Sequence, residues 1–101
     1  MRIISGNHKG RKLSPPGNLP VRPTTDYAKE SLFNILQNHF DFEDLTILDC
    51  FSGTGNISYE FLSRGVRKAS SIDANFNCIA YQKKVKKELK GHQIFLSRAH
   101  P

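Results

Sequence analysis

The chain has 101 residues and carries 15 Lys and Arg against 9 Asp and Glu, which gives a net charge of +6. This length limits it to one small domain, and the basic balance favours a polyanionic partner. The chain has only two cysteines, too few for a disulfide framework, and their thiols fit a reducing cytoplasm. Its four histidines lack the spacing of metal ligands, which argues against a metal site. No apolar run approaches the ~18 residues of a membrane span, so no membrane partner is expected.

The first 22 residues predict a basic hairpin followed by a proline-rich linker. Residues 2–5 and 11–13 are typical of two short strands around turn-prone glycines, and the linker at 15–20 excludes both a helix and a central strand. Because residues 1–22 contain no acid, the hairpin is a candidate contact for RNA phosphates through Arg2, Lys9, Arg11 and Lys12. The alternative is a solubilising edge hairpin without a ligand.

A helix is expected after the linker. Thr25 or Asp26 can cap its N-terminus, and the pattern continues to about His39. One side of this helix is expected to pack on the sheet, and it consists of Ala28, Leu32, Ile35, Leu36 and His39.

The most informative stretch begins after the acidic connection 41–44. Residues 46–48 favour an extended, buried strand, which ends in the carboxylate of Asp49. Gly53 and Gly55 permit a tight turn in which no Cβ keeps a ligand from the backbone. A helix should follow from Asn56, with an apolar face and a glycine stop formed by Ile57, Phe61, Leu62, Arg64 and Gly65.

Three ligands compete for this turn. A P-loop needs a Lys followed by Ser or Thr after its second glycine, and the chain has neither there. A dinucleotide site needs a third glycine, for which Ser58 is an imperfect substitute, and Asp49 would repel a pyrophosphate. A carboxylate suits instead the sulfonium and amine of S-adenosylmethionine. The next strand, 69–73, ends in Asp73, which can accept hydrogen bonds from both ribose hydroxyls. The alternative without a ligand is a βαβ unit whose acids only cap helices.

The last third of the chain predicts one more helix and strand. Asn75 should cap a helix that runs through Lys90 and stops at Gly91. Its buried stripe is expected to be Cys78, Tyr81, Val85 and Leu89. Its lysines, at 83, 84, 86, 87 and 90, predict a solvated face, with an RNA contact as the alternative. Residues 93–97 should form the third strand.

Three blocks of residues resemble the RsmD family, which methylates the exocyclic N2 of a guanine in bacterial 16S ribosomal RNA. Residues 49–55 look like motif I of class I methyltransferases. Residues 22–26 and 30–36 resemble the family signature, and residues 2–13 match its N-terminal hairpin. Since the blocks occur in the right order over nearly the whole chain, the resemblance is far more specific than a lone glycine motif.

This resemblance implies an α/β, Rossmann-like class I methyltransferase fold, truncated after about the third strand. Residues 1–22 would be the hairpin and linker, and residues 23–101 the N-terminal half of the methyltransferase domain. The family's sheet has seven strands, so we expect the chain to be a fragment whose open sheet edge invites self-association. The intact protein would act in the cytoplasm on ribosomal RNA or the small ribosomal subunit, with S-adenosylmethionine as cofactor.

The resemblance also implies the site. Asp49 would anchor the amino end of the cofactor and Asp73 would bind the ribose. Arg22 and Thr24 would close over the methionine end, although Thr24 is equally a capping residue. The expected cofactor-binding residues are Asp49, Phe51, Ser52, Gly53, Thr54, Gly55, Asp73, Ala74, Arg22 and Thr24.

Two features depart from the family. Its catalytic signature is Asn or Asp followed by Pro-Pro and an aromatic residue, and the only Pro-Pro of this chain is at 15–16, so no catalytic residue is assigned. Arg98 stands where the family has a small polar or acidic residue near the adenine amino group. Two other functions remain open. One is a basic RNA-binding module of methyltransferase shape without activity, and the other is an NAD-binding oxidoreductase fragment that uses residues 53–58.

Overall fold

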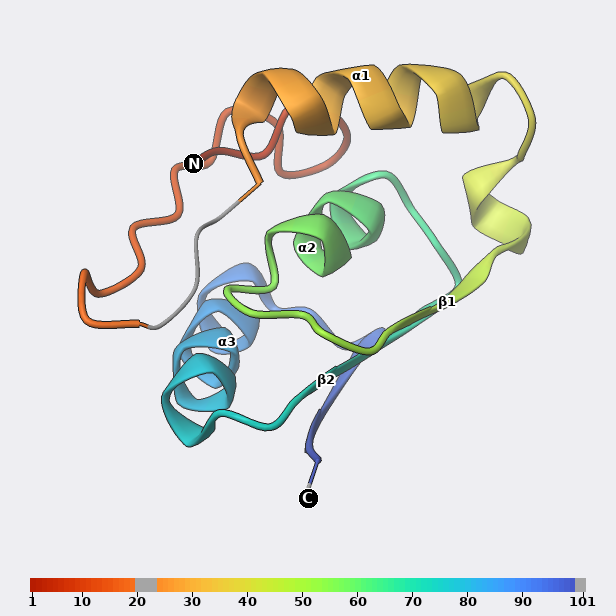
Figure 1. Cartoon of the computed structure of the whole chain (residues 1–101). Coiled ribbons are helices and arrows are strands. Elements are labelled where there is room, and N and C mark those ends of the chain that lie inside the picture. Colours follow the sequence, from red (N-terminus) through yellow and green to blue (C-terminus); the bar gives the residue numbers. More distant parts are fainter. Residues whose placement is uncertain (20–23, 100–101) are drawn as a thin grey trace.

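The computed structural model describes residues 1–19 and 24–99 (Figure 1). Its elements are α1 (Asp26–Gln37), the 3-10 helix η1 (Phe42–Asp44), β1 (Thr46–Asp49), α2 (Asn56–Ser63), β2 (Lys68–Asp73), α3 (Phe76–Leu89) and β3 (Ile94–Arg98). The predicted α/β class and the three strands are confirmed. None of the helices in these ranges is long and apolar enough to span a membrane.

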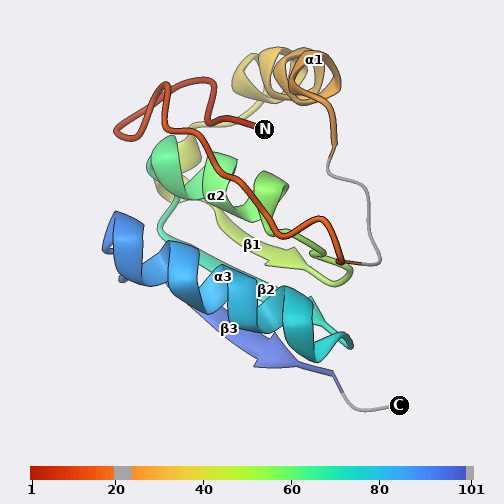
Figure 2. The same ribbon diagram turned by 90° about the vertical axis from the view of Figure 1, so that its left-hand side faces the viewer.

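The three strands form one parallel sheet in the order β1-β2-β3. Both crossovers step in the same direction along the sheet. Because such crossovers are right-handed, α2 and α3 lie on the same face, as Figure 2 shows. The carboxyl ends of the strands meet at one edge, which brings Asp49 and Asp73 to the same end of the sheet.

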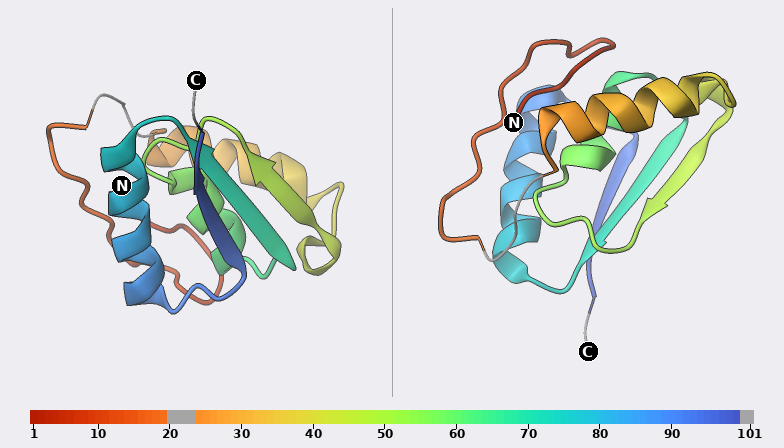
Figure 3. Two further views of the ribbon diagram at one scale, coloured as in Figure 1. Left: turned by 90° about the horizontal axis from the view of Figure 1, so that it is seen from below. Right: turned by 45° about the horizontal axis from the view of Figure 1, so that its top comes forward.

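The opposite face of the sheet is bare of helices in the described ranges, and the left view of Figure 3 looks onto it. Leu48 and Phe95 project there and are 63% and 50% exposed. The prediction that β1 is buried is therefore wrong. Successive side chains of a strand alternate between faces, and only the face that carries Ile47 is covered.

Helix α1 forms a third layer over α2 and does not pack on the sheet (Figures 1 and 3). Its buried residues are Lys29 and Phe33. The Phe33 ring lies 4.6 Å from that of Phe61 and 6.0 Å from that of Phe42, centroid to centroid. The predicted packing face is therefore wrong, since Leu32 and Ile35 are 41% and 59% exposed. The actual face contains a lysine, which a pattern of apolar residues passes over.

The N-terminal segment is a hairpin without regular strands. One antiparallel bridge joins Arg2 and Lys12, and the amide of Ile3 donates to the carbonyl of Arg11 at 2.9 Å. The two predicted strands are thus reduced to a single bridge. Ile3 and Leu13 are buried in the main core, together with Tyr59, Leu62, Val85 and Ile94.

The observed helix ends agree with those predicted from the sequence to within about two residues. Thr25 caps α1, Asn75 caps α3, and the predicted buried stripe of α3 is buried throughout. Helix α1 ends at Gln37 and not at His39. Helix α3 ends at Leu89, and Lys90, not Gly91, adopts the left-handed conformation with φ +53°.

Candidate functional site

The turn between β1 and α2 is fixed by hydrogen bonds to β2. The amide and the hydroxyl of Ser52 both donate to the carbonyl of Ile72, each at 3.0 Å. Gly53 and Gly55 have φ of +56° and +80°, a region that favours glycine. The predicted tight turn is present, and its backbone lies at the carboxyl edge of the sheet.

Asp73 joins this turn to the start of α3. One carboxylate oxygen accepts from the amide of Gly53 and the other from the amide of Asn75, both at 2.8 Å. A carboxylate oxygen can accept a second hydrogen bond, so each keeps a free acceptor position for a further donor. The turn and its acid therefore form one unit.

Asp49 lies half-buried at the end of β1, where the hydroxyl of Ser58 donates to its Oδ2 at 2.8 Å. Burial raises the pKa of Asp49. Hydrogen bonds from Ser58 and the backbone of Phe51 lower it, the charge of Asp73 raises it further, and the net result is a raised pKa. Ser58 stands where a dinucleotide motif has its third glycine. Here its hydroxyl instead donates a hydrogen bond to the carboxylate of Asp49.

Gln82 is the residue of this site that the sequence did not reveal. It is fully buried in α3. Its Nε2 donates to the hydroxyl of Ser52 and the carbonyl of Gly53, both at 2.8 Å, and its Oε1 accepts from the hydroxyl of Ser71 at 2.7 Å. A Cβ on Gly55 would lie 2.8 Å from Gln82 Cδ. The available signal was a polar residue beside the apolar stripe of α3.

A buried ion pair, also missed, connects α1 to α2. Lys29 and Glu60 are fully buried, and Lys29 Nζ lies 3.0 Å from Glu60 Oε1. Lys29 also donates to the carbonyl of Arg2 and, at 2.7 Å, to Asn56 Oδ1. Arg64 Nε donates to Glu60 Oε2 at 2.8 Å. Both charges are therefore compensated, as a buried pair requires.

The same network fixes the hairpin. Glu60 accepts from the amide of Ile4 at 2.8 Å and from that of Ser5 at 3.1 Å. Burial alone would raise the pKa of Glu60, but the hydrogen bonds from Ile4, Arg64 and Lys29 outweigh it, so the pKa is lowered.

Asn56 connects this network to the segment before α1. Its Nδ2 donates to the carbonyl of Thr24 at 2.8 Å, which places Thr24 beside the start of α2 and next to the glycine turn. The hydroxyl of Thr25 accepts from the amide of Ala28 at 3.2 Å and caps α1. Arg22, the other residue expected to close over the cofactor, lies outside the described residues.

The remaining predicted residues lie around these groups. Thr54 is buried, whereas the Phe51 side chain is 94% exposed. The carbonyl of Ala74 accepts from Arg98 Nε at 3.1 Å. Among residues 1–19 and 24–99 no cluster of three or more His, Cys, Asp or Glu is arranged to hold a metal ion.

The basic residues of the hairpin are not equivalent. Arg2 forms an exposed pair with Asp26, at 3.4 Å between Nε and Oδ2. Lys9, Arg11 and Lys12 are exposed and form no ion pair within the described ranges. Three of the four predicted RNA contacts therefore remain free for an anion.

Comparison with known proteins gives the family. The model of the family described as Conserved hypothetical protein 95 matches residues 1–99. The ribosomal RNA small subunit methyltransferase D of Escherichia coli is 44% identical over 73 residues, which are 72% of this chain and 36% of that protein. The protein of the same name in Buchnera aphidicola subsp. Baizongia pistaciae is 32% identical over 100 residues, which are 99% of this chain and 50% of that protein.

A solved structure agrees with these relatives. It is described as "Putative methyltransferase yhhF from Escherichia coli" and matches with a TM-score of 0.84 at 33% identity, over 99% of this chain and 52% of that chain. The chain thus spans about half the length, or less, of the proteins it matches. It belongs to the Conserved hypothetical protein 95 family, the RsmD family of the ribosomal RNA small subunit methyltransferases D, and carries the N-terminal half of a Rossmann-like methyltransferase fold.

Proposed function

We propose that the complete protein transfers a methyl group to the exocyclic N2 of a guanine in 16S ribosomal RNA, and that this chain supplies its cofactor-binding half. The supporting observation is the glycine turn, which is held by Asp73 through the amide of Gly53 and lies beside a second carboxylate, Asp49. The preference for guanine N2 rests on the resemblance of residues 22–26, 30–36 and 49–55 to the family signature.

The residues of the turn fit S-adenosylmethionine, which when bound supplies an electrophilic methyl group on a sulfonium. Gly53 and Gly55 leave the backbone open to a ligand. Asp73 keeps acceptor positions for ribose hydroxyls, and Asp49 would hold the cationic amine. The backbone of residues 51–55 and Ala74 would line the pocket, and Thr24 would border its methionine end, with Arg22 from the neighbouring segment.

Within this proposal residues 1–22 form the RNA-contacting hairpin and linker, and residues 23–101 the methyltransferase half-domain. Lys9, Arg11 and Lys12 would bind phosphates without reading the sequence. No catalytic residue is proposed, because the Asn/Asp-Pro-Pro-aromatic signature does not occur in the sequence.

The two carboxylates argue against a dinucleotide. Each raises the negative potential at the start of α2, where a pyrophosphate would have to sit. Burial is the main cause of the raised pKa of Asp49, and the nearby charge of Asp73 raises it further.

The test is a calorimetric titration of this chain with S-adenosylhomocysteine, with NAD as the competing ligand. Replacing Asp73 by Ala would release the amides of both Gly53 and Asn75, so Asp73→Asn, which keeps one acceptor oxygen and releases only one of them, is the better variant. We expect the parent to bind S-adenosylhomocysteine but not NAD, and Asp73→Asn to bind it about tenfold or more weakly, since a charge-assisted hydrogen bond contributes about 1.5–3 kcal/mol.

Asp41→Asn is the matched control, because it removes the same charge from an exposed position. An equal loss of S-adenosylhomocysteine affinity in both variants would mean that the effect comes from the change in net charge and not from a contact of Asp73. Binding of NAD in place of S-adenosylhomocysteine would refute the proposal. RNA binding with a steep salt dependence, but without S-adenosylhomocysteine binding, would favour the RNA-binding module without activity.

A further inference from the structure

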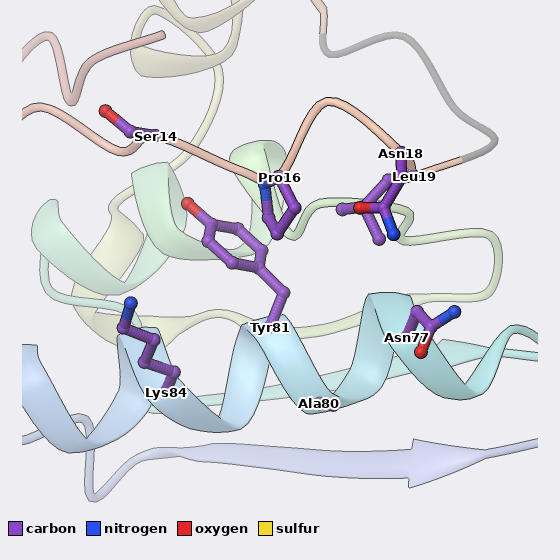
Figure 4. A pocket seen from close by; sticks show the side chains of 8 residues that line it. All are labelled: Ser14, Pro16, Asn18, Leu19, Asn77, Ala80, Tyr81 and Lys84. Atoms are coloured by element: carbon purple, nitrogen blue, oxygen red, sulfur yellow. The ribbon is translucent and has the colours of Figure 1, made fainter.

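A pocket of about 380 Å³ lies between the proline-rich linker and the side of α3 that carries Tyr81 (Figure 4). Its lining residues are Ser14, just before the linker, three residues of the linker within 16–19, and four residues of α3 within 77–84. None of them belongs to the glycine turn or to the two carboxylates of the candidate cofactor site. The pocket is therefore a separate feature of the fold.

Tyr81 is the central wall of this pocket. Its side chain rises from α3 between Pro16 and Lys84, with the hydroxyl directed toward Ser14 (Figure 4). Tyr81 is only 8% exposed, and its hydroxyl has no hydrogen-bond partner in the described part of the chain. A buried hydroxyl without a partner destabilises the fold, so a ligand group that reached it would offset this cost.

In its described part, residues 15–19, the linker over Tyr81 is held by packing against the fold. Among the described residues no hydrogen bond joins positions 14–18 to the rest of the fold, and the one bond within the linker runs from the amide of Leu19 to the carbonyl of Pro16, at 3.3 Å. Leu19 packs against the core. The linker can therefore adjust locally around a ligand without breaking the hydrogen bonds of the sheet or helices.

The polar groups of the pocket are divided between its two ends (Figure 4). At one end lie the Tyr81 hydroxyl and the ammonium of Lys84, two donors that suit a phosphate, with Ser14 beside them. At the other end are the amides of Asn18 and Asn77, which both donate and accept, as base edges require. Pro16, Leu19 and the part of Tyr81 that lines the pocket form an apolar wall between them, against which a base can pack.

We propose that this pocket binds one unpaired nucleotide of an RNA, with the phosphate at the Ser14–Lys84 end and the base toward Asn18 and Asn77. The proposal rests on the proposed function, in which RNA is the substrate. It adds a second RNA contact, on the lysine-rich side of α3 and away from the glycine turn. A nucleotide held there would flank the methylated base and not be the methylated base itself.

The test is an NMR titration of the full chain with a single-stranded RNA hexanucleotide and, separately, with guanosine 5′-monophosphate. We expect saturable shifts at the side-chain amides of Asn18 and Asn77 with both ligands. Lys84→Gln should weaken RNA binding about fivefold or more, because it removes a phosphate donor. Lys87→Gln removes the same charge from the same helix outside this pocket and should change binding less than about twofold. Equal effects of the two variants, or the absence of saturable shifts at the two amides, would overturn the proposal.

Tyr81→Phe provides a second readout, since it removes only the unpartnered hydroxyl. If that hydroxyl serves a ligand, the variant should have a Tm at least as high as the parent and a weaker affinity for RNA. A lower Tm would mean that the hydroxyl of Tyr81 has a hydrogen-bond partner within the protein. An unchanged RNA affinity would mean that the hydroxyl does not contact the ligand. Either result would overturn its assigned role.

A parallel titration with S-adenosylhomocysteine separates the two proposals. If the cofactor analogue binds and RNA does not shift the pocket, only the nucleotide site fails. If RNA shifts the pocket and the analogue does not bind, the nucleotide site stands and the cofactor proposal fails.

Discussion

Gln82 of α3 donates a hydrogen bond to the carbonyl oxygen of Gly53 at 2.8 Å, although the two residues are 29 positions apart in the sequence. Through this bond the helix after β2 fixes the turn after β1. The geometry of the candidate cofactor site is thus set in part by a fully buried side chain of α3.

Replacing Gln82 by Leu should therefore destabilise both the fold and the site. The substitution leaves the hydroxyl of Ser71 and the carbonyl of Gly53 without this partner in a buried setting. We expect a loss of about 2–4 kcal/mol in the free energy of unfolding, measured with urea. Gln93→Leu, at an exposed position, should change it by less than about 0.5 kcal/mol. Similar values for both variants would contradict the bracing role of Gln82.

Gly55→Ala tests the packing of the turn against Gln82. The new Cβ would lie 2.8–2.9 Å from Gln82 side-chain atoms, at a φ of +80°. Gly10 has a nearly identical φ of +82° but open space around it. We expect Gly10→Ala to cost about 1–2 kcal/mol for the backbone conformation alone, and Gly55→Ala about 1–3 kcal/mol more. Equal Tm values for the two variants would show that the turn can accommodate a Cβ at position 55 beside Gln82.

Lys29→Met should be among the most destabilising single substitutions in the chain. It removes one partner of a fully buried ion pair and leaves Glu60 with Arg64 as its remaining cation. Breaking such a pair costs about 3–5 kcal/mol, whereas Lys87→Met on the exposed face of α3 should cost less than about 0.5 kcal/mol. Urea unfolding of both variants checks this expectation, and a small effect at Lys29 would mean that the pair is open to water.

The stability of the fold should fall in acid because of Glu60. Its pKa in the folded state is lowered from the ordinary value of 4.5, so its ionised form stabilises the fold above that pH. This contribution is lost as the pH falls below 4.5 and through the lower folded pKa. The loss of unfolding free energy on acidification should be smaller in Glu60→Gln than in the parent, and unchanged in Glu43→Gln, whose side chain is exposed.

The pKa of Asp49 shifts in the opposite direction from that of Glu60, so its effect on stability is also opposite. Its pKa is raised from 3.8, chiefly by burial, so the ionised carboxylate destabilises the fold at neutral pH. Asp49→Asn keeps an acceptor for the hydroxyl of Ser58 and should have a higher Tm than the parent at pH 7. In calorimetry the same variant should bind S-adenosylhomocysteine about tenfold more weakly, since it loses a charge-assisted contact. A variant that is less stable, or that binds equally well, would contradict a functional carboxylate.

Local chemistry predicts much of this fold. The caps Thr25 and Asn75, the turn at Gly53 and Gly55, and the buried stripe of α3 each depend on residues within a few positions of one another, so the sequence displays them directly. Asp49 and Asp73 are predictable as neighbours because parallel strands bring their carboxyl ends together.

The errors at α1 and at Gln82 have a common physical cause, which is dependence on distant partners. Lys29 can be buried only because Glu60, 31 positions later, neutralises it, and it shares the inward face of α1 with Phe33. The apolar residues Leu32 and Ile35 indicated the other face. Gln82 was missed for the same reason, because its hydrogen-bond partners lie in two other segments.

The attachment of the hairpin to α2 has a consequence for synthesis of the protein. Ile4 and Ser5 are held by Glu60, and Asn7 by the carbonyl of Ser63, partners that lie 55 or 56 positions later in the chain. At about 5–20 residues per second, a ribosome needs roughly 3–11 s to make the intervening chain. During that interval the basic hairpin has emerged without the carboxylate that fixes it, and it can settle only after α2 has left the exit tunnel.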